Sequence, residues 1–259
     1  MDVYIENLVS YTSHQQSVDY WTLITLAFVS FAGSFLTAAI GIGGGSLVLA
    51  SMTLFFSPAV LIPIHAIIQF GSNAGRASLM FSEISWHLVF PFIFGAFFGV
   101  LIGGALFISL PVSVLQSIIA LFILYSTWSK KISAHKSHRT VLFFVGGGSS
   151  FLSMFVGATG PLIAPFVATA CNTRHQIVST HALLMSIQHG FKTIVFIFLG
   201  ASIAPYCLLI FSMLLLGYLG TYIGKKLLDI LPEKLFRKTL KWVLTAMAIR
   251  LLYIAVTQT

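Results

Sequence analysis

The chain has 259 residues, of which 58% are hydrophobic and only 8% are charged, with a formal net charge of +8. Soluble domains carry charge on about a quarter of their residues, so this composition excludes a water-soluble enzyme and predicts a polytopic membrane protein. The positive charge does not indicate nucleic-acid binding, because ten of the fourteen Lys and Arg residues form two clusters, at 130–139 and 225–241, that flank apolar runs. Such placement is typical of cytoplasmic loops.

Apolar runs follow one another in two series along the chain. A tail at 1–20 has no Lys or Arg, and it precedes segments at 21–40, 46–56, 63–81, 87–109 and 112–128. A basic linker at 129–140 precedes segments at 141–156, 161–170, 177–200, 205–224 and 235–256. A helix needs about 20 residues to cross the hydrocarbon core, so 46–56 and 161–170 are predicted to be half-helices or re-entrant arms.

The second series is a diverged copy of the first. One constant offset aligns Gly41 with Gly157, His65 with His181, and Arg76 with Lys192. Such duplication in an apolar chain is typical of transporters built around one shared site. We therefore divide the chain into a tail (1–20), a first transmembrane repeat (21–128), a linker (129–140) and a second transmembrane repeat (141–259).

The basic loops predict how the two repeats are oriented. The linker at 129–140 and the loop at 225–238 are both basic, so both are predicted to be cytoplasmic. The loop at 109–112, which is the counterpart of the second one, carries no charge and is predicted to be external. Matching loops then lie on opposite faces, which makes the repeats inverted and places both termini outside.

A glycine-rich break precedes each short segment, at 41–45 and at 157–161. Non-helical backbone at membrane depth is tolerated only inside protein or beside a cavity. Half-helices that begin at Ser46 and Leu162 would direct N–H groups and a positive dipole end towards the breaks, which favours an anion. The alternative is that the glycines only allow close helix packing, as we expect for Gly95, Gly99, Gly103 and Gly104.

The long segments after the breaks carry matching polar faces. The first places His65, Gln69, Ser72 and Arg76 on one helical face with Asn73 beside it, and the second places His181, Met185, Gln188 and Lys192 there with His189 beside it. Arg76 and Lys192 lie inside apolar runs with no acidic residue at comparable depth, which by default indicates a functional site. The alternative for Arg76 is that it snorkels to an interface, and the histidines could simply be hydrogen-bond partners between helices.

Metal and catalytic sites are not indicated. Cys171 and Cys207 fit no metal-ligand spacing, and His65 and His181 have no cysteine or carboxylate companions. The six acidic residues lie almost entirely in termini and loops, so no catalytic triad or carboxylate pair can form at membrane depth. We expect no cofactor, no metal and no enzymatic activity.

Several motifs together resemble the TauE/SafE family of sulfite exporters and related anion permeases. They are the glycine run at 41–45, the pattern His-x-x-x-Gln-x-x-Ser-Asn-x-x-Arg ending at Arg76, the sequence Glu-Ile-Ser-Trp at 83–86, and the second copy at 157–165. The resemblance runs from about residue 25 to the end, and it implies a bacterial plasma-membrane permease for sulfite, sulfonates or related organic anions. One departure is that the proline often found after the first glycine run is absent, and only the second copy keeps Pro165.

We predict an all-α membrane protein of two inverted repeats that exports small sulfur-containing anions by alternating access, coupled to a proton or Na+. The anion would lie between the breaks, oriented by amide side chains, attracted by the two cations and gated or proton-coupled by the histidines. The residues in this predicted site are Gly43, Gly44, Gly45, Ser46, His65, Gln69, Asn73, Arg76, Thr159, Gly160, Pro161, His181, Gln188 and Lys192. Its partners would be the lipid bilayer and the anion, with a homodimer left open. A permease for another small anion or a neutral solute, or a non-transporting membrane scaffold, is the alternative.

Overall fold

The computed structural model describes residues 18–40, 43–107, 110–128, 139–228 and 233–257, and within these ranges all regular structure is helical. Short 3₁₀ turns precede α5 and α10. The α-helices are α2 (Tyr20–Ile40), α3 (Gly44–Met52), α4 (Pro58–Leu79), α5 (Val89–Phe107), α6 (Val112–Trp128), α7 (Arg139–Val156), α8 (Gly160–Ala170), α9 (Arg174–Phe198), α10 (Cys207–Lys226) and α11 (Glu233–Thr257). Residues 1–17 of the predicted tail, 129–138 of the predicted linker, and Gly41 lie outside the described residues.

Each apolar segment predicted from the sequence corresponds to one helix, but both long central helices begin earlier than predicted. Helix α4 begins at Pro58 rather than at residue 63, because extended Ser57 precedes a proline that suits the first helical turn. Helix α9 begins at Arg174 rather than at residue 177, because the Thr173 side chain accepts a hydrogen bond from the Gln176 N–H at 3.1 Å and caps the helix.

The two short helices are too short to cross a bilayer, as predicted. Helix α3 has 9 residues and α8 has 11, so at 1.5 Å per residue they extend roughly 14 and 16 Å, about half of a hydrocarbon core. They begin at Gly44 and Gly160, each two residues before the predicted starts at Ser46 and Leu162.

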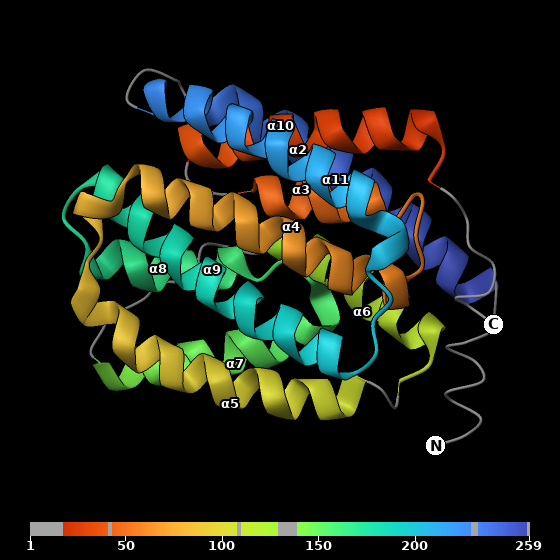
Figure 1. Cartoon of the computed structure of the whole chain (residues 1–259), viewed down its shortest axis with the longest axis horizontal. Coiled ribbons are helices and arrows are strands. Elements are labelled where there is room, and N and C mark those ends of the chain that lie inside the picture. The colour runs from red at the N-terminus through yellow and green to blue at the C-terminus, as the bar shows by residue number, and fades with distance from the viewer. Residues whose placement is uncertain (1–17, 41–42, 108–109, 129–138, 229–232, 258–259) are drawn as a thin grey trace.

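Helices from the two halves of the chain alternate in space. Helix α2 packs along α10, α5 packs along α7, and α4 packs along α9. In Figure 1 the α2–α10 pair and the α5–α7 pair form two outer layers, and α4 and α9 run between them. Helices α6 and α11 form a further pair. Because each pair joins the first half to the second, neither half buries its central helix without the other.

Glycines allow the outer pairs to pack at short distance. A Cβ at Gly95 would lie 1.9 Å from the carbonyl oxygen of Phe143 on α7, and a Cβ at Gly220 would lie 2.2 Å from that of Phe31 on α2. Close backbone approach through small residues is the usual way in which helices associate in membranes. The packing role predicted for Gly95 is therefore confirmed, and Gly99, which meets Gly147, has the same role.

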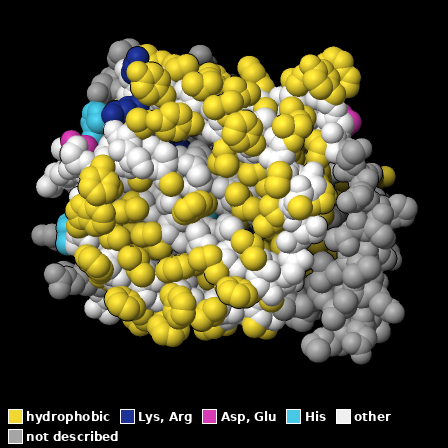
Figure 2. Space-filling view, viewed as in Figure 1, with side chains coloured by type: hydrophobic (Ala, Val, Ile, Leu, Met, Phe, Trp, Pro, Cys, Tyr) yellow, Lys and Arg dark blue, Asp and Glu magenta, His cyan; other side chains and the backbone are white. Residues whose placement is uncertain are grey.

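The outer surface is apolar. Among the residues that the structure describes, four helical stretches are long and apolar enough to cross a membrane: Tyr20–Ala39, Trp86–Phe107, Arg174–Phe198 and Ala204–Lys226. Helices α5 and α10 expose large hydrophobic side chains, among them Phe90, Phe94, Phe98, Phe211 and Leu215. Figure 2 shows hydrophobic side chains across most of the described surface in view, with charged and histidine side chains mainly near its edges. This surface suits lipid rather than water.

We expect Gly95→Ala and Gly220→Ala to destabilise the protein, because each added methyl group meets a backbone carbonyl that cannot move alone. Overpacking costs about 1–3 kcal/mol, so both variants should melt several degrees below the wild type in detergent. Gly148→Ala is the matched control, because nothing lies within 4 Å of a Cβ there. Equal melting temperatures for Gly95→Ala and Gly148→Ala would contradict this packing.

Candidate functional site

The two breaks are sharp because glycine adopts conformations there that other residues avoid. Gly43, directly before α3, has φ 112°, and Gly157, directly after α7, has φ 80°. Both values lie in the left-handed region, which glycine enters without a Cβ penalty. The chain therefore turns abruptly at each break, and a half-helix begins within three residues of each of these glycines.

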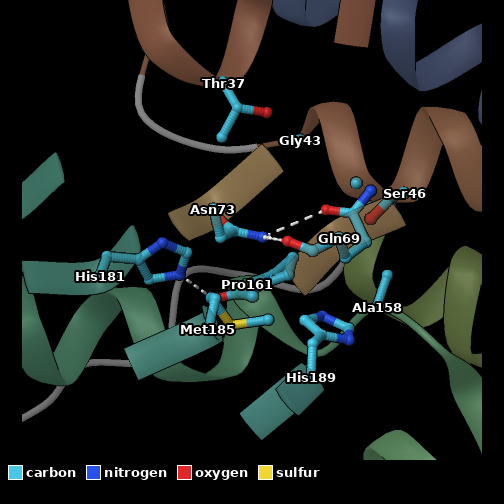
Figure 3. Close-up of a pocket in the computed structure, with 12 residues that line it drawn as sticks. Thr37, Gly43, Ser46, Gln69, Asn73, Ala158, Pro161, His181, Met185 and His189 are labelled. Atoms are coloured by element: carbon cyan, nitrogen blue, oxygen red, sulfur yellow. Dashed lines mark hydrogen bonds between the residues drawn. The ribbon is translucent and has the colours of Figure 1, made fainter. Parts of the chain in front are cut away.

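A pocket lies between the two breaks. Its cavity volume is about 30 Å³. In Figure 3, Gln69 and Asn73 from α4 face His181, Met185 and His189 from α9 across the pocket. The lining residues are Thr37, Gly43, Gly45, Ser46, Gln69, Asn73, Ala158, Gly160, Pro161, His181, Met185 and His189.

Two histidines at matching positions tie the long helices to the half-helices. The Nε2 atom of His65 on α4 lies 3.2 Å from the carbonyl oxygen of Gly45 on α3. The Nε2 atom of His181 on α9 lies 3.1 Å from the carbonyl oxygen of Gly160 on α8. Because a carbonyl only accepts, each Nε2 carries the hydrogen in these contacts, and each Nδ1 is buried without a partner.

An amide network on α4 leaves donors for a ligand. The Nδ2 group of Asn73 donates to the carbonyl oxygen of Gln69 at 2.8 Å and to its Oε1 at 3.3 Å. The Oε1 of Gln69 is thereby occupied, while its amide nitrogen and the hydroxyl of Ser46 make no hydrogen bond within the described part of the chain. Both residues line the pocket, so both groups are available to donate to a bound molecule.

A second network holds the break before α8. The Nε2 group of Gln188 on α9 donates to the Thr159 hydroxyl at 2.6 Å, and the hydroxyl of Ser149 on α7 lies 3.3 Å from Gln188 Oε1. Gln188 and Thr159 are both fully buried. These bonds join α7, the break and α9, so Gln188 positions the backbone that lines the pocket and does not line it itself.

Both cations are buried behind the pocket wall. Arg76 is 2% exposed and donates through a terminal guanidinium nitrogen to Asn73 Oδ1 at 3.1 Å, while its Nε has no partner. Lys192 is 0% exposed and donates to the carbonyl oxygen of Ser153, near the end of α7. Of the acidic residues, only Asp19 and Glu83 have side chains that the structure describes, and neither is buried. The burial of Arg76 does not fit the snorkelling alternative.

The structure separates the predicted site residues into two groups. Gly43, Gly45, Ser46, Gln69, Asn73, Gly160, Pro161 and His181 line the pocket, whereas Gly44, His65, Arg76, Thr159, Gln188 and Lys192 support it or lie behind it. Gly44 packs on the backbone of Gly33, and its N–H donates to the Thr37 hydroxyl at 3.0 Å. No cluster of three His, Cys, Asp or Glu side chains suited to a metal ion occurs among the described residues.

Four lining residues were not included in the predicted site: Thr37, Ala158, Met185 and His189. The repeat alignment contains a signal for two of them, because Met185 aligns with Gln69 and His189 with Asn73. Ala158 lies inside the predicted second break and could have been included on that ground. For Thr37 the sequence has no comparable signal, because it lies in the last turn of an apolar helix.

A model of the sulfite exporter TauE/SafE family matches residues 25–251. The chain belongs to the TauE/SafE family. It is therefore a multi-pass membrane protein of a transporter family, which agrees with its apolar helices. Comparison with curated proteins and with solved structures found no match.

We expect Gln188→Met to lower the melting temperature, because it leaves the hydroxyls of Thr159 and Ser149 without their buried amide partner. An unsatisfied buried polar group costs about 1–3 kcal/mol. Gln116→Met on α6 is the control, because Gln116 is only partly buried and has no hydrogen bond in the described part of the chain. If both variants melt with the wild type, the Gln188 network does not hold the break.

Proposed function

We propose that the protein is a secondary transporter that exports small sulfur-containing anions, such as sulfite or organosulfonates, across the bacterial plasma membrane. The observation that supports this most directly is the pocket between the starts of α3 and α8, with two buried cations behind it. Membership of the sulfite exporter family supports the substrate class.

The surroundings of the pocket favour an anion over other solutes. The starts of α3 and α8 direct positive dipole ends towards the pocket, while Gln69 and Ser46 offer donors. Arg76 and Lys192 add positive charge in surroundings of low dielectric constant, where charge acts over longer distances than in water. A cation would be repelled by this arrangement, and a neutral solute would gain little from it.

The helix pairing supports two inverted repeats that move against each other. Under the repeat alignment α2 corresponds to α7 and α10 to α5, so the α2–α10 contact has its counterpart in the α7–α5 contact. The α4–α9 contact joins two corresponding helices at the centre. Alternating access would be a rocking of one outer layer against the other around the pocket, with both termini outside and a proton or Na+ gradient driving export.

The hydrogen bonds from the two histidines to the half-helices, which we call the histidine tethers, would make each half-helix move together with a long helix. His65 ties α3 to α4, and His181 ties α8 to α9. Each half-helix start would therefore move with the neighbouring long helix as the two layers rock. In this proposal the tethers keep the anion-binding N–H groups in place while the pocket opens to one side and then to the other.

The first experiment measures anion binding by thermal stability of the purified protein. Sulfite and sulfoacetate are expected to raise the melting temperature by several degrees at about a hundredfold excess over Kd, because a ligand of the folded state stabilises it by about 2.7 kcal/mol there. Taurine and chloride should have little effect. Arg76→Gln and Lys192→Gln should lose the shift, whereas Lys226→Gln, which removes an exposed cation, should keep it.

Transport follows in proteoliposomes loaded with labelled sulfite. The wild type and Lys226→Gln should release the label, and folded Lys192→Gln should retain it. Folded Arg76→Gln and Lys192→Gln proteins with undiminished flux would contradict the anion site. Loss of association with a membrane partner, with no flux in the wild type, would support the scaffold alternative instead.

A further inference from the structure

His189 is a buried polar side chain of the pocket that has no hydrogen-bond partner in the part of the chain that the structure describes. It lines the pocket and is 1% exposed, yet its Nδ1 is buried without a partner and its ring makes no hydrogen bond within the described residues. The His65 ring lies edge-on to it, with the two ring centroids 5.9 Å apart and an interplanar angle of 75°. A buried polar ring without partners is costly unless a ligand or a proton completes it.

The two repeats differ at the position of His189. Asn73, which corresponds to His189, is satisfied at both ends: its nitrogen donates to Gln69 and its oxygen accepts from Arg76. An amide cannot change its charge in the physiological range, whereas an imidazole can. The second copy therefore places a titratable group where the first copy has a fixed one.

The groups that face His189 are all neutral or positive. His65 approaches from α4, and His181 and Lys192 lie one or two turns away on α9 itself. Arg76, also on α4, acts electrostatically on His181. Helices α3 and α8 contain no titratable residue, and α7 has none with a described side chain. No described acidic side chain is buried to balance a further positive charge.

We propose that an anion entering the pocket brings one proton onto His189, so that the protein binds a small oxyanion together with a proton. This rests on the proposed function and names the side chain that takes up a proton when the anion binds. The proton comes from water, adds to a ring nitrogen when the anion is present, and returns to water when the anion leaves. No other bond forms or breaks.

The cause is mutual stabilisation of two charges. A positive imidazolium buried near Lys192 is unfavourable in the empty pocket, because no carboxylate that the structure describes is buried there to pair with it. A bound anion supplies the missing negative charge, and the protonated ring in return offers the anion a charge-assisted hydrogen bond. Because such coupling is reciprocal, lower pH must strengthen anion binding as much as the anion strengthens proton binding.

The test is calorimetric titration of the full-length protein in detergent with methanesulfonate. This probe stays a monoanion across the accessible pH range, so any proton taken up belongs to the protein. Titrations in buffers of different ionisation enthalpy should show uptake of about one proton per anion, and affinity should rise about tenfold per pH unit where the proton is fully linked. His189→Asn, which copies the first repeat, should still bind but take up no proton.

The control variant is His87→Asn, which changes an exposed histidine outside the pocket and should behave as the wild type. Binding without proton uptake by the wild type would overturn the inference and leave the proposed function standing. Uptake that persists in His189→Asn would overturn the assignment to His189. If that variant does not fold, His189→Gln is titrated instead, and the wild-type uptake still decides whether a proton is coupled. Failure of the wild type to bind methanesulfonate, sulfite or sulfoacetate would contradict both proposals.

Discussion

The rest of the structure depends on one constraint: backbone that leaves the helix inside an apolar protein must be enclosed by other parts of that protein. Helix α3 and helix α8 each start midway through the molecule, after breaks at Gly43 and Gly157. The second break is covered by the first half, because Leu49 of α3 packs directly on Gly157. The interleaved helix pairs follow from this need, since each half supplies the cover that the other requires.

Positions at which the two repeats carry the same residue build the framework of the site, and positions at which they differ carry its chemistry. His65 and His181 agree, and both hold the start of a half-helix through a backbone carbonyl. The copies differ at Asn73 and His189, and at Arg76 and Lys192, where a group of fixed charge is paired with one that can titrate. In the proposed cycle the matched features build a symmetric framework around the anion, and His189 links its binding to a proton.

The sequence predicted the helices well because apolar runs and glycine breaks are local signals. Both short helices were predicted from their length, and the starts of α4 and α9 were misplaced because the helix-starting proline at Pro58 and the cap by Thr173 were overlooked. The layering was not predicted, because which helix packs on which is decided by distant glycines such as Gly95 and Gly220. The periodicity of α9 predicted a polar face but not that His189 lines the pocket while Lys192 lies behind it.

The most direct test of the account is the position of an oxyanion in an experimental structure. Selenite has the same pyramidal shape as sulfite, and selenium gives an anomalous signal that locates it without ambiguity. Crystals of the protein soaked in selenite should show one peak between Ser46 of α3 and Gly160 of α8, within hydrogen-bonding distance of the Gln69 amide, and excess sulfite should remove it. A peak elsewhere, or none while selenite binds in solution, would contradict an anion site between the two breaks.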